Sequence, residues 1–162
     1  MSVADDQCEL CRNTNGDSGG NKGHNTDQKT GGEVLWGDAL CRVVLVTNAD
    51  YPGYCRVIWN NHEREMTDLT ASDRRHLMSV VYAVEAAVRT CLNPDKINLA
   101  SLGNQVPHMH WHVIPRWHDD RHFPQAIWGQ PQRETAPRAG VKVAALRTRL
   151  IQALAEEQGG EA

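Results

Sequence analysis

Hydrophobic residues in the first half of the chain gather in short runs that have the length of β-strands. Residues 41–47 form a largely apolar run, typical of a central strand, and residues 54–59 form a second run. Between them, Tyr51-Pro52-Gly53 has the residues of a type II turn, so the two runs are predicted to pair as an antiparallel hairpin. Residues 33–36 and 97–102 are predicted as two further strands.

From residue 70 the apolar positions are spaced by three and four, which predicts a helix ending near residue 92. The apolar residues at this spacing are Leu77, Val80, Val81, Val84, Val88 and Cys91. Thr70 and Asp73 resemble an N-terminal capping box, and Asn93-Pro94 is typical of a helix end. A second helix is predicted over residues 141–157, where Leu146, Leu150 and Leu154 mark one face.

Residues 107–116 alternate between histidine and apolar residues in a way that fits a strand. Successive side chains of a strand point to opposite faces of the sheet, so His108, His110 and His112 are predicted to share one face. Met109, Trp111 and Val113 are then expected to face the core. Strands followed by a helix and further strands indicate an α+β fold with a mostly antiparallel sheet.

The first 33 residues have a different composition from the rest of the chain. Residues 13–32 are rich in Gly, Asn, Asp, Ser and Thr, which predicts a long, flexible loop. We therefore divide the chain into an N-terminal segment (1–33), a domain with the strands and the first helix (34–129), and a C-terminal helix and tail (130–162).

Length and charge narrow the class of protein. The 162 residues predict one domain, and a net charge of −3 argues against a nucleic-acid binder held by broad electrostatics. No apolar run approaches the roughly 18 residues of a membrane span, and the polar N-terminus does not resemble a signal peptide. The five cysteines do not favour a disulfide framework. We expect a cytoplasmic protein that binds neither nucleic acid nor membrane.

Three histidines on one face of a strand point to chemistry. Imidazole acts near neutral pH as a nucleophile, a general base or a metal ligand. Cys8 and Cys11 form a Cys-x-x-Cys pair, which is half of a zinc site, a redox pair or two ordinary cysteines. His24 is a spare candidate ligand.

The motif His108-x-His110-x-His112 resembles the signature of the histidine triad superfamily. Similarity extends to residues 103–106 before the triad, to the Pro-Gly turn at 52–53 and to His62 with the residues that follow it. The resemblance implies an α+β fold with about five antiparallel strands and a central helix across one face. The helix predicted over residues 141–157 adds a C-terminal helix to this fold.

The resemblance also implies a function, nucleotidyl transfer from a nucleoside phosphate to water or another acceptor. His110 would attack the α-phosphorus, His112 would assist the leaving group, and His108 would contact the phosphate or bind a metal ion. The nucleotide substrate, a dinucleoside polyphosphate or a phosphoramidate, would bind to further residues. These candidate substrate-binding residues are Asn48, Asn104, Gln105 and Arg116.

Some members of the superfamily bind zinc, and by this resemblance the ligands here would be Cys8, Cys11, His62 and His108. We expect a structural zinc ion, no organic cofactor and a homodimer. Two other functions stay open: an enzyme with a metal ion on the three histidines, and a nucleotide-binding module without turnover.

Overall fold

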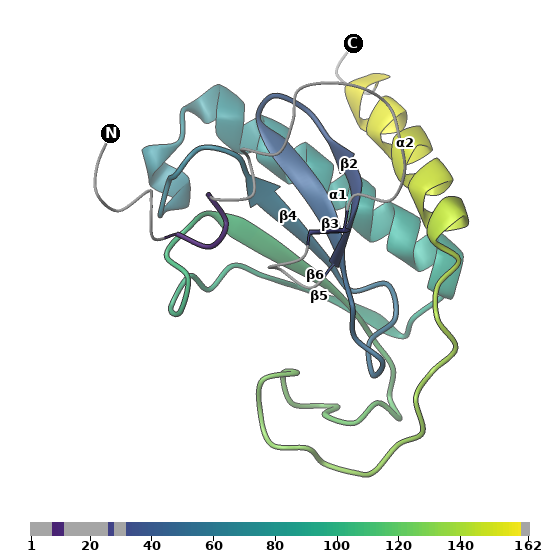
Figure 1. The fold of residues 1–162 in the computed structure, drawn as a ribbon. Coiled ribbons are helices and arrows are strands. Elements are labelled where there is room, and N and C mark those ends of the chain that lie inside the picture. The colour runs from purple at the N-terminus through teal and green to yellow at the C-terminus, as the bar shows by residue number, and fades with distance from the viewer. Residues whose placement is uncertain (1–7, 12–25, 28–31, 160–162) are drawn as a thin grey trace.

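The computed structural model describes residues 8–11, 26–27 and 32–159, and its centre is an antiparallel sheet (Figure 1). The sheet has the order β1-β2-β3-β4-β6-β5, and every neighbouring pair is antiparallel. The strands are β1 (Thr26–Asp27), β2 (Gly32–Gly37), β3 (Cys41–Val46), β4 (Cys55–Trp59), β5 (Lys96–Ala100) and β6 (His110–Arg116). The predicted α+β fold is confirmed, with the short β1 as an addition to the five expected strands.

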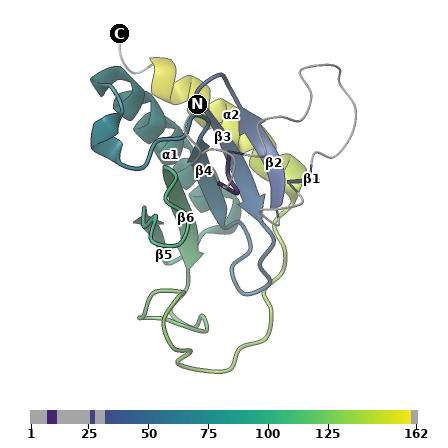
Figure 2. The same cartoon turned by 60° about the vertical axis from the view of Figure 1, so that its left-hand side comes forward.

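Two helices cover the same face of the sheet (Figures 1 and 2). Helix α1 (Ala71–Leu92) contacts β4 and β6, and α2 (Val143–Gly159) packs against α1 and β2. A short 3₁₀ helix, Met66–Asp68, precedes α1. Among the described residues, neither helix has the length and hydrophobicity needed to cross a membrane.

The strands divide the sheet into a covered face and an open face. The core under the helices contains Val43, Val57 and Val113 from the three central strands, together with Leu77 of α1 and Leu150 of α2, all buried. Because side chains alternate, the residues between them on β3, β4 and β6 point to the other face. The histidines of β6 therefore lie on the open face, away from both helices.

Local sequence signals explain where the elements begin and end. The Thr70 side chain accepts a hydrogen bond from the Asp73 N–H at the start of α1, and Asn93 ends the helix in the left-handed conformation (φ 45°). Gly53 has φ +83° in the predicted turn, and a Cβ there would lie 2.2 Å from Leu92 Cδ1. Glycine at this position thus permits both the turn and its close contact with α1.

The prediction of a loop over residues 13–32 is wrong where the structure describes this region. Thr26 and Asp27 pair with Glu33 and Gly32, because the end of β2 offers them free backbone groups. His24 lies outside the described residues. The sequence boundaries at residues 34 and 129 stay a prediction.

Candidate active site

The triad histidines lie at the start of β6, on the open face of the sheet. His110 and His112 belong to the strand and are buried, while Trp111 and Val113 pack into the core under α1. The predicted alternation is thus confirmed. His108 comes just before the strand and is also buried.

One nitrogen of His110 is held by the backbone. Its Nδ1 lies 2.6 Å from the carbonyl oxygen of His108. Since a carbonyl oxygen only accepts hydrogen bonds, Nδ1 carries the proton, and Nε2 of the neutral ring keeps its lone pair. Burial lowers the pKa of His110, which favours this neutral form. The ring is therefore prepared to act as a nucleophile through Nε2.

The environment of His112 consists of a tyrosine, a tryptophan and the neighbouring histidine. The Tyr54 hydroxyl lies 2.6 Å from Nδ1 of His112. The imidazole rings of His110 and His112 meet edge to face with centroids 4.8 Å apart, and the Trp128 ring lies 5.1 Å from His112. Burial, together with the charges of His110 and Arg56, lowers the pKa of His112 to about 3.

Arg56 brings a positive charge to the open face. It is partly buried on β4, and its Cα pairs with that of His112 across the two strands. Its Nε is buried without a hydrogen-bond partner among the described residues. The side chain thus places an arginine beside two neutral imidazoles.

Four side chains of metal-ligating type meet at the other end of the triad. Nδ1 of His108 lies 3.4 Å from Cys8 Sγ and 3.3 Å from Cys11 Sγ, and Cys11 Sγ lies 3.2 Å from Nδ1 of His62. These ligand atoms, with one from each residue, all lie within 4.8 Å of one another. The predicted set Cys8, Cys11, His62 and His108 is therefore brought together by the fold.

Backbone contacts explain how this cluster forms despite the separation in sequence. Leu10 is buried against Val44 and Ile58 on the open face, and its carbonyl accepts a hydrogen bond of 2.7 Å from Arg42. The N–H of Met109 donates to the carbonyl of Glu63 at 2.6 Å, which holds the loop after β4 beside the triad. These contacts place both cysteines and His62 next to His108.

The cluster fits a tetrahedral zinc ion. With Zn–S near 2.3 Å and Zn–N near 2.0 Å, a sulfur and a nitrogen ligand of a tetrahedral ion are about 3.5 Å apart, close to the separations found here. Nε2 of His108 lies 2.6 Å from the Trp59 carbonyl, which fixes the proton on that nitrogen and leaves Nδ1 facing the two sulfurs. Two sulfurs and two imidazole nitrogens are a donor set that zinc prefers.

Comparisons with known proteins identify the family. The sequence profile of the HIT (histidine triad) domain family matches residues 28–119. The chain belongs to this family. No curated protein sequence matches it.

Several solved structures share the HIT fold with this chain. A histidine triad protein from Bradyrhizobium japonicum is 26% identical, with a TM-score of 0.60 over 82% of this chain and 94% of its own. A histidine triad protein from Marinobacter aquaeolei VT8 is 25% identical, with a TM-score of 0.61 over 78% of this chain and 90% of its own. A Zn-bound histidine triad family protein from Mycobacterium smegmatis is 20% identical, with a TM-score of 0.58 over 96% and 99% of the two chains.

Within the described residues, the three triad histidines of this HIT chain do not converge as one group of metal-ligating atoms. Within the described part of the chain, the groups of converging metal-ligating atoms include His108 with Cys8, Cys11 and His62, but neither His110 nor His112. The other such group, Asp38, Cys41 and His76, lies away from the triad, where Asp38 accepts a hydrogen bond from His76 at 2.8 Å.

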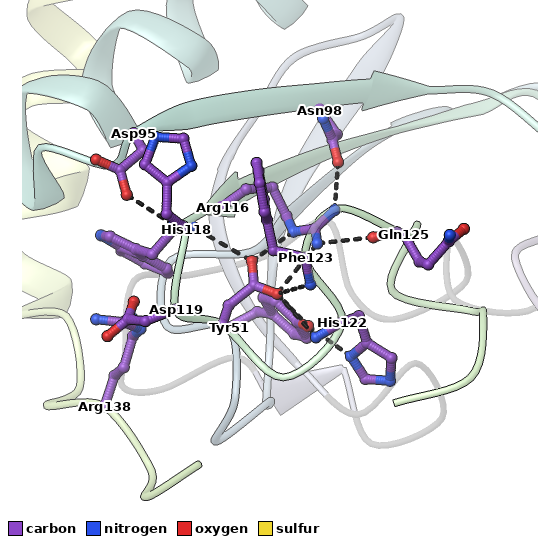
Figure 3. Close-up of polar contacts among 12 residues, drawn as sticks. Tyr51, Asp95, Asn98, Arg116, His118, Asp119, His122, Phe123, Gln125 and Arg138 are labelled. Atoms are coloured by element: carbon purple, nitrogen blue, oxygen red, sulfur yellow. Dashed lines mark hydrogen bonds and ion pairs between the residues drawn. The ribbon is translucent and has the colours of Figure 1, made fainter. Parts of the chain in front are cut away.

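Arg116, a predicted substrate-binding residue, is enclosed by groups of the protein itself. It is at the far end of β6, 2% exposed, and donates to Asp120 through Nε at 2.7 Å and through a terminal nitrogen at 3.1 Å (Figure 3). Asn98 Oδ1 and the Gln125 carbonyl accept its other hydrogen bonds. These contacts assign Arg116 to holding the loop after β6, because its donors are already used by the protein.

This loop carries Trp128 to the triad. Asp120 accepts backbone hydrogen bonds from His122 and Phe123, and the Tyr51 hydroxyl donates to it at 3.2 Å (Figure 3). Burial alone would raise the pKa of Asp120, but the hydrogen bonds from Arg116 and the backbone lower it to about 2. A charged, buried carboxylate thus organises the segment that ends beside His112.

The remaining predicted substrate-binding residues are Asn104, Gln105 and Asn48, and they differ in their surroundings. Asn104 and His108 line a cavity of about 340 Å³. Gln105 is exposed. Asn48 Oδ1 accepts hydrogen bonds from the N–H groups of Asp50 and Tyr51, so this side chain stabilises its own turn. A role of these three residues in substrate binding stays a prediction.

Two residues of the site were missed by the sequence analysis. Tyr54 and Arg56 were assigned to a strand but not to the site, because their contact with His112 depends on the pairing of β4 with β6. The alternation of β4 was an available signal, since it places both on one face. Trp128 comes from the loop after β6, and its contact with His112 likewise depends on how that loop folds back.

Proposed function

We propose that this HIT-family chain is a nucleotide hydrolase or nucleotidyl transferase that acts at the α-phosphate of a nucleoside phosphate through a covalent intermediate on His110. The observation that carries the proposal is the hydrogen bond from Nδ1 of His110 to the His108 carbonyl. It leaves the Nε2 lone pair of His110, a residue of the open face, available to attack phosphorus.

The reaction has two displacements at phosphorus. Nε2 of His110 forms a bond to the α-phosphorus while the bond from phosphorus to the leaving group breaks. Water, or another acceptor, then attacks the same phosphorus and loses a proton, and the P–N bond breaks with its electron pair returning to His110. The products are the nucleotide bearing the acceptor oxygen, the protonated leaving group and the free enzyme.

His112 is the proposed hydrogen-bond donor to the leaving group in the first step, where charge develops on the departing atom. Burial raises the pKa of Tyr54, so its hydroxyl stays protonated and is suited to donate to Nδ1 of His112. The neutral His112 ring then carries its own proton on Nε2, which is the nitrogen available to the leaving group. Tyr54 is therefore a positioning residue that sets the tautomer of His112.

Binding of the nucleotide requires groups around the reacting phosphorus. Asn104, beside the triad, is a candidate donor to the phosphate oxygens, and Asn48 and Gln105 are candidates for the ribose or phosphate. Trp128 is 51% exposed although its ring contacts His112, which makes it a candidate surface for the base. The aromatic ring would bind different bases by stacking without specifying one of them.

Zinc is the proposed structural metal of the Cys8, Cys11, His62 and His108 cluster. When bound, it would contribute a four-ligand crosslink between the N-terminal segment, the loop after β4 and the start of the triad. The residues themselves fix His108, whose carbonyl receives the His110 hydrogen bond. Reaction at the α-phosphorus is assigned to His110 and His112 alone.

Turnover in ¹⁸O-labelled water tests the reaction site. Diadenosine tetraphosphate and an adenosine phosphoramidate would be incubated with wild-type protein and with His110→Ala, and the products would be analysed by mass spectrometry. Attack at the α-phosphorus predicts AMP carrying one labelled oxygen, with a loss of rate in His110→Ala of about a thousandfold or more. Unlabelled AMP, or activity retained in His110→Ala, would contradict the proposal.

The homodimer is also a proposal, and it rests on the family resemblance. Light scattering after size-exclusion chromatography measures the mass directly. A mass twice that of the chain would support the dimer, and a mass equal to that of the chain would exclude it.

A further inference from the structure

We infer that Arg56 binds the phosphates that follow the α-phosphate, and that the site therefore prefers nucleoside polyphosphates to phosphoramidates and acyl adenylates. The inference rests on the proposed function and names the substrate class of the same site. It assigns a role to a residue that neither the triad motif nor the zinc cluster includes.

The position of Arg56 follows from the register of three strands. Its Cα pairs with Val44 on one side and with His112 on the other, while the next open-face residue of β4, Ile58, pairs with His110. Arg56 is thus opposite one active-site histidine and diagonal to the other. At this spacing a long side chain reaches a group bound at either imidazole.

The charge of Arg56 is not balanced by the protein. Among the described residues, no carboxylate forms an ion pair with Arg56, and its buried Nε has no hydrogen-bond partner. Its neighbour on this face is Tyr54, whose ring centroid lies 6.0 Å from the guanidinium carbon, and this uncharged partner leaves the positive charge unbalanced. A partly buried cation of this kind is stabilised when an anion completes its hydrogen bonds. The arrangement is that of a binding group which lacks its ligand.

The other open-face arginines of the central strands are used differently. Arg42 donates to the carbonyl of Leu10 and to Asn60, and Arg116 forms the buried pair with Asp120. Both lie in hydrogen bonds that hold a segment of the chain in place. Arg56 is the arginine of this face that lies beside His112, where the charge of a substrate would be.

The chemistry of the leaving group explains the preference. His110 must be neutral to act as a nucleophile, so the imidazoles offer hydrogen bonds rather than charge to the phosphate. A guanidinium group matches phosphate oxygens in geometry and charge. Each phosphate beyond the first adds negative charge for Arg56 to bind, whereas the amine or carboxylic acid released from the other substrates adds none.

A binding experiment tests this role without requiring turnover. Isothermal titration calorimetry would measure the affinities of wild type, Arg56→Gln and Arg56→Lys for two ligands. These are AMP and α,β-methylene-ATP, which cannot be cleaved at the α-phosphate. We expect Arg56→Gln to weaken the binding of α,β-methylene-ATP about tenfold more than the binding of AMP, as is typical for the loss of a charged hydrogen bond. Arg56→Lys keeps the charge and is expected to recover part of the difference.

Arg75→Gln is the matched control, because it removes the same charge from an exposed position on α1, on the covered side of the sheet. It is expected to leave both affinities unchanged. The inference would be overturned if Arg56→Gln lost the same factor of affinity for both ligands, or if Arg75→Gln lost as much affinity for α,β-methylene-ATP as Arg56→Gln does. Failure of wild type to bind α,β-methylene-ATP would also overturn it. Retained AMP binding shows that the variant is folded.

Kinetics separate this inference from the proposed function. With diadenosine tetraphosphate and adenosine phosphoramidate as substrates, Arg56→Gln is expected to lower kcat/KM for the tetraphosphate about tenfold more than for the phosphoramidate. If wild type cleaves neither substrate, the proposed function fails, and the calorimetric difference still decides the role of Arg56. If both substrates are cleaved and Arg56→Gln lowers kcat/KM for both by the same factor, the proposed role of Arg56 fails and the proposed function stands.

Discussion

Tyr54 directly precedes β4, His112 lies on the neighbouring strand β6, and the tyrosine hydroxyl is 2.6 Å from Nδ1 of the imidazole. This contact joins β4, which the triad motif does not include, to the third histidine of the motif. It gives the catalytic proposal a residue that can be changed without touching the triad.

Tyr54→Phe removes one oxygen atom and with it the hydrogen bond that sets the tautomer of His112. We expect kcat to fall about tenfold, with KM within about twofold of the wild-type value, because positioning of the hydrogen-bond donor to the leaving group is lost while the nucleotide contacts remain. Steady-state kinetics with diadenosine tetraphosphate measure both. Tyr51→Phe is the control, since it makes the same change at a buried tyrosine that contacts Asp120 instead of the triad. A similar loss of kcat in both variants would contradict the assignment.

The cluster of Cys8, Cys11, His62 and His108 predicts metal binding with a defined stoichiometry. Purified protein is expected to contain about one zinc per chain by inductively coupled plasma mass spectrometry, and Cys11→Ser is expected to lose it and to unfold at a lower temperature. Cys91→Ser, a change at a cysteine of α1 outside the cluster, is expected to keep the metal. Equal zinc content in wild type and Cys11→Ser would exclude these ligands.

The Asp120 carboxylate predicts acid-sensitive stability. Its pKa is about 2 in the folded protein, against a reference value of 3.8. A lowered carboxylate pKa stabilises the charged folded state, so this stabilisation is complete above the reference value and is lost as the pH falls through 3.8 toward 2. Thermal unfolding between pH 5 and pH 2 measures the effect.

Asp120→Asn tests the same group by substitution. It leaves Arg116 buried without its charged partner, which is expected to cost about 3 kcal/mol of unfolding free energy at pH 7. It should also reduce the loss of stability between pH 4 and pH 2. Asp119→Asn changes the exposed neighbour and is expected to have little effect on either quantity. An unchanged acid profile in Asp120→Asn would show that another group is responsible.

Trp128 predicts an effect on binding rather than on chemistry. Trp128→Ala is expected to raise KM about tenfold, since stacking of a base on an aromatic ring contributes about 1–3 kcal/mol, while kcat changes little. Trp128→Phe keeps an aromatic face and should recover most of the affinity. A fall in kcat with an unchanged KM would instead indicate that Trp128 positions His112.

The parts of the fold that sequence analysis predicted are those with local signals. The alternation around His110, the spacing from Leu77 to Val88 and the capping residue Thr70 each specify an element through near neighbours. These signals located the triad strand, its two faces and both helices. Similarity to the HIT family added the four residues of the zinc cluster, which lie in three separate segments of the chain.

The parts that sequence analysis missed depend on contacts between distant segments. Arg116 follows a strand and looks like a surface residue or a phosphate ligand, but Asp120 and Asn98 enclose it. Tyr54 and Arg56 acquire their roles only when β4 pairs with β6. Thr26 and Asp27 form a strand because β2 offers an edge, although their own sequence predicts a loop. In each case the partner is far away in the sequence and leaves no periodic signal.

Intact-protein mass spectrometry after a brief, acid-sparing quench with diadenosine tetraphosphate tests the central claim most directly. We expect a species heavier than the wild-type chain by one AMP group, absent in His110→Ala and still formed in the presence of a chelator. An adduct that persists in His110→Ala, or an adduct that requires the metal ion, would contradict nucleophilic attack by His110.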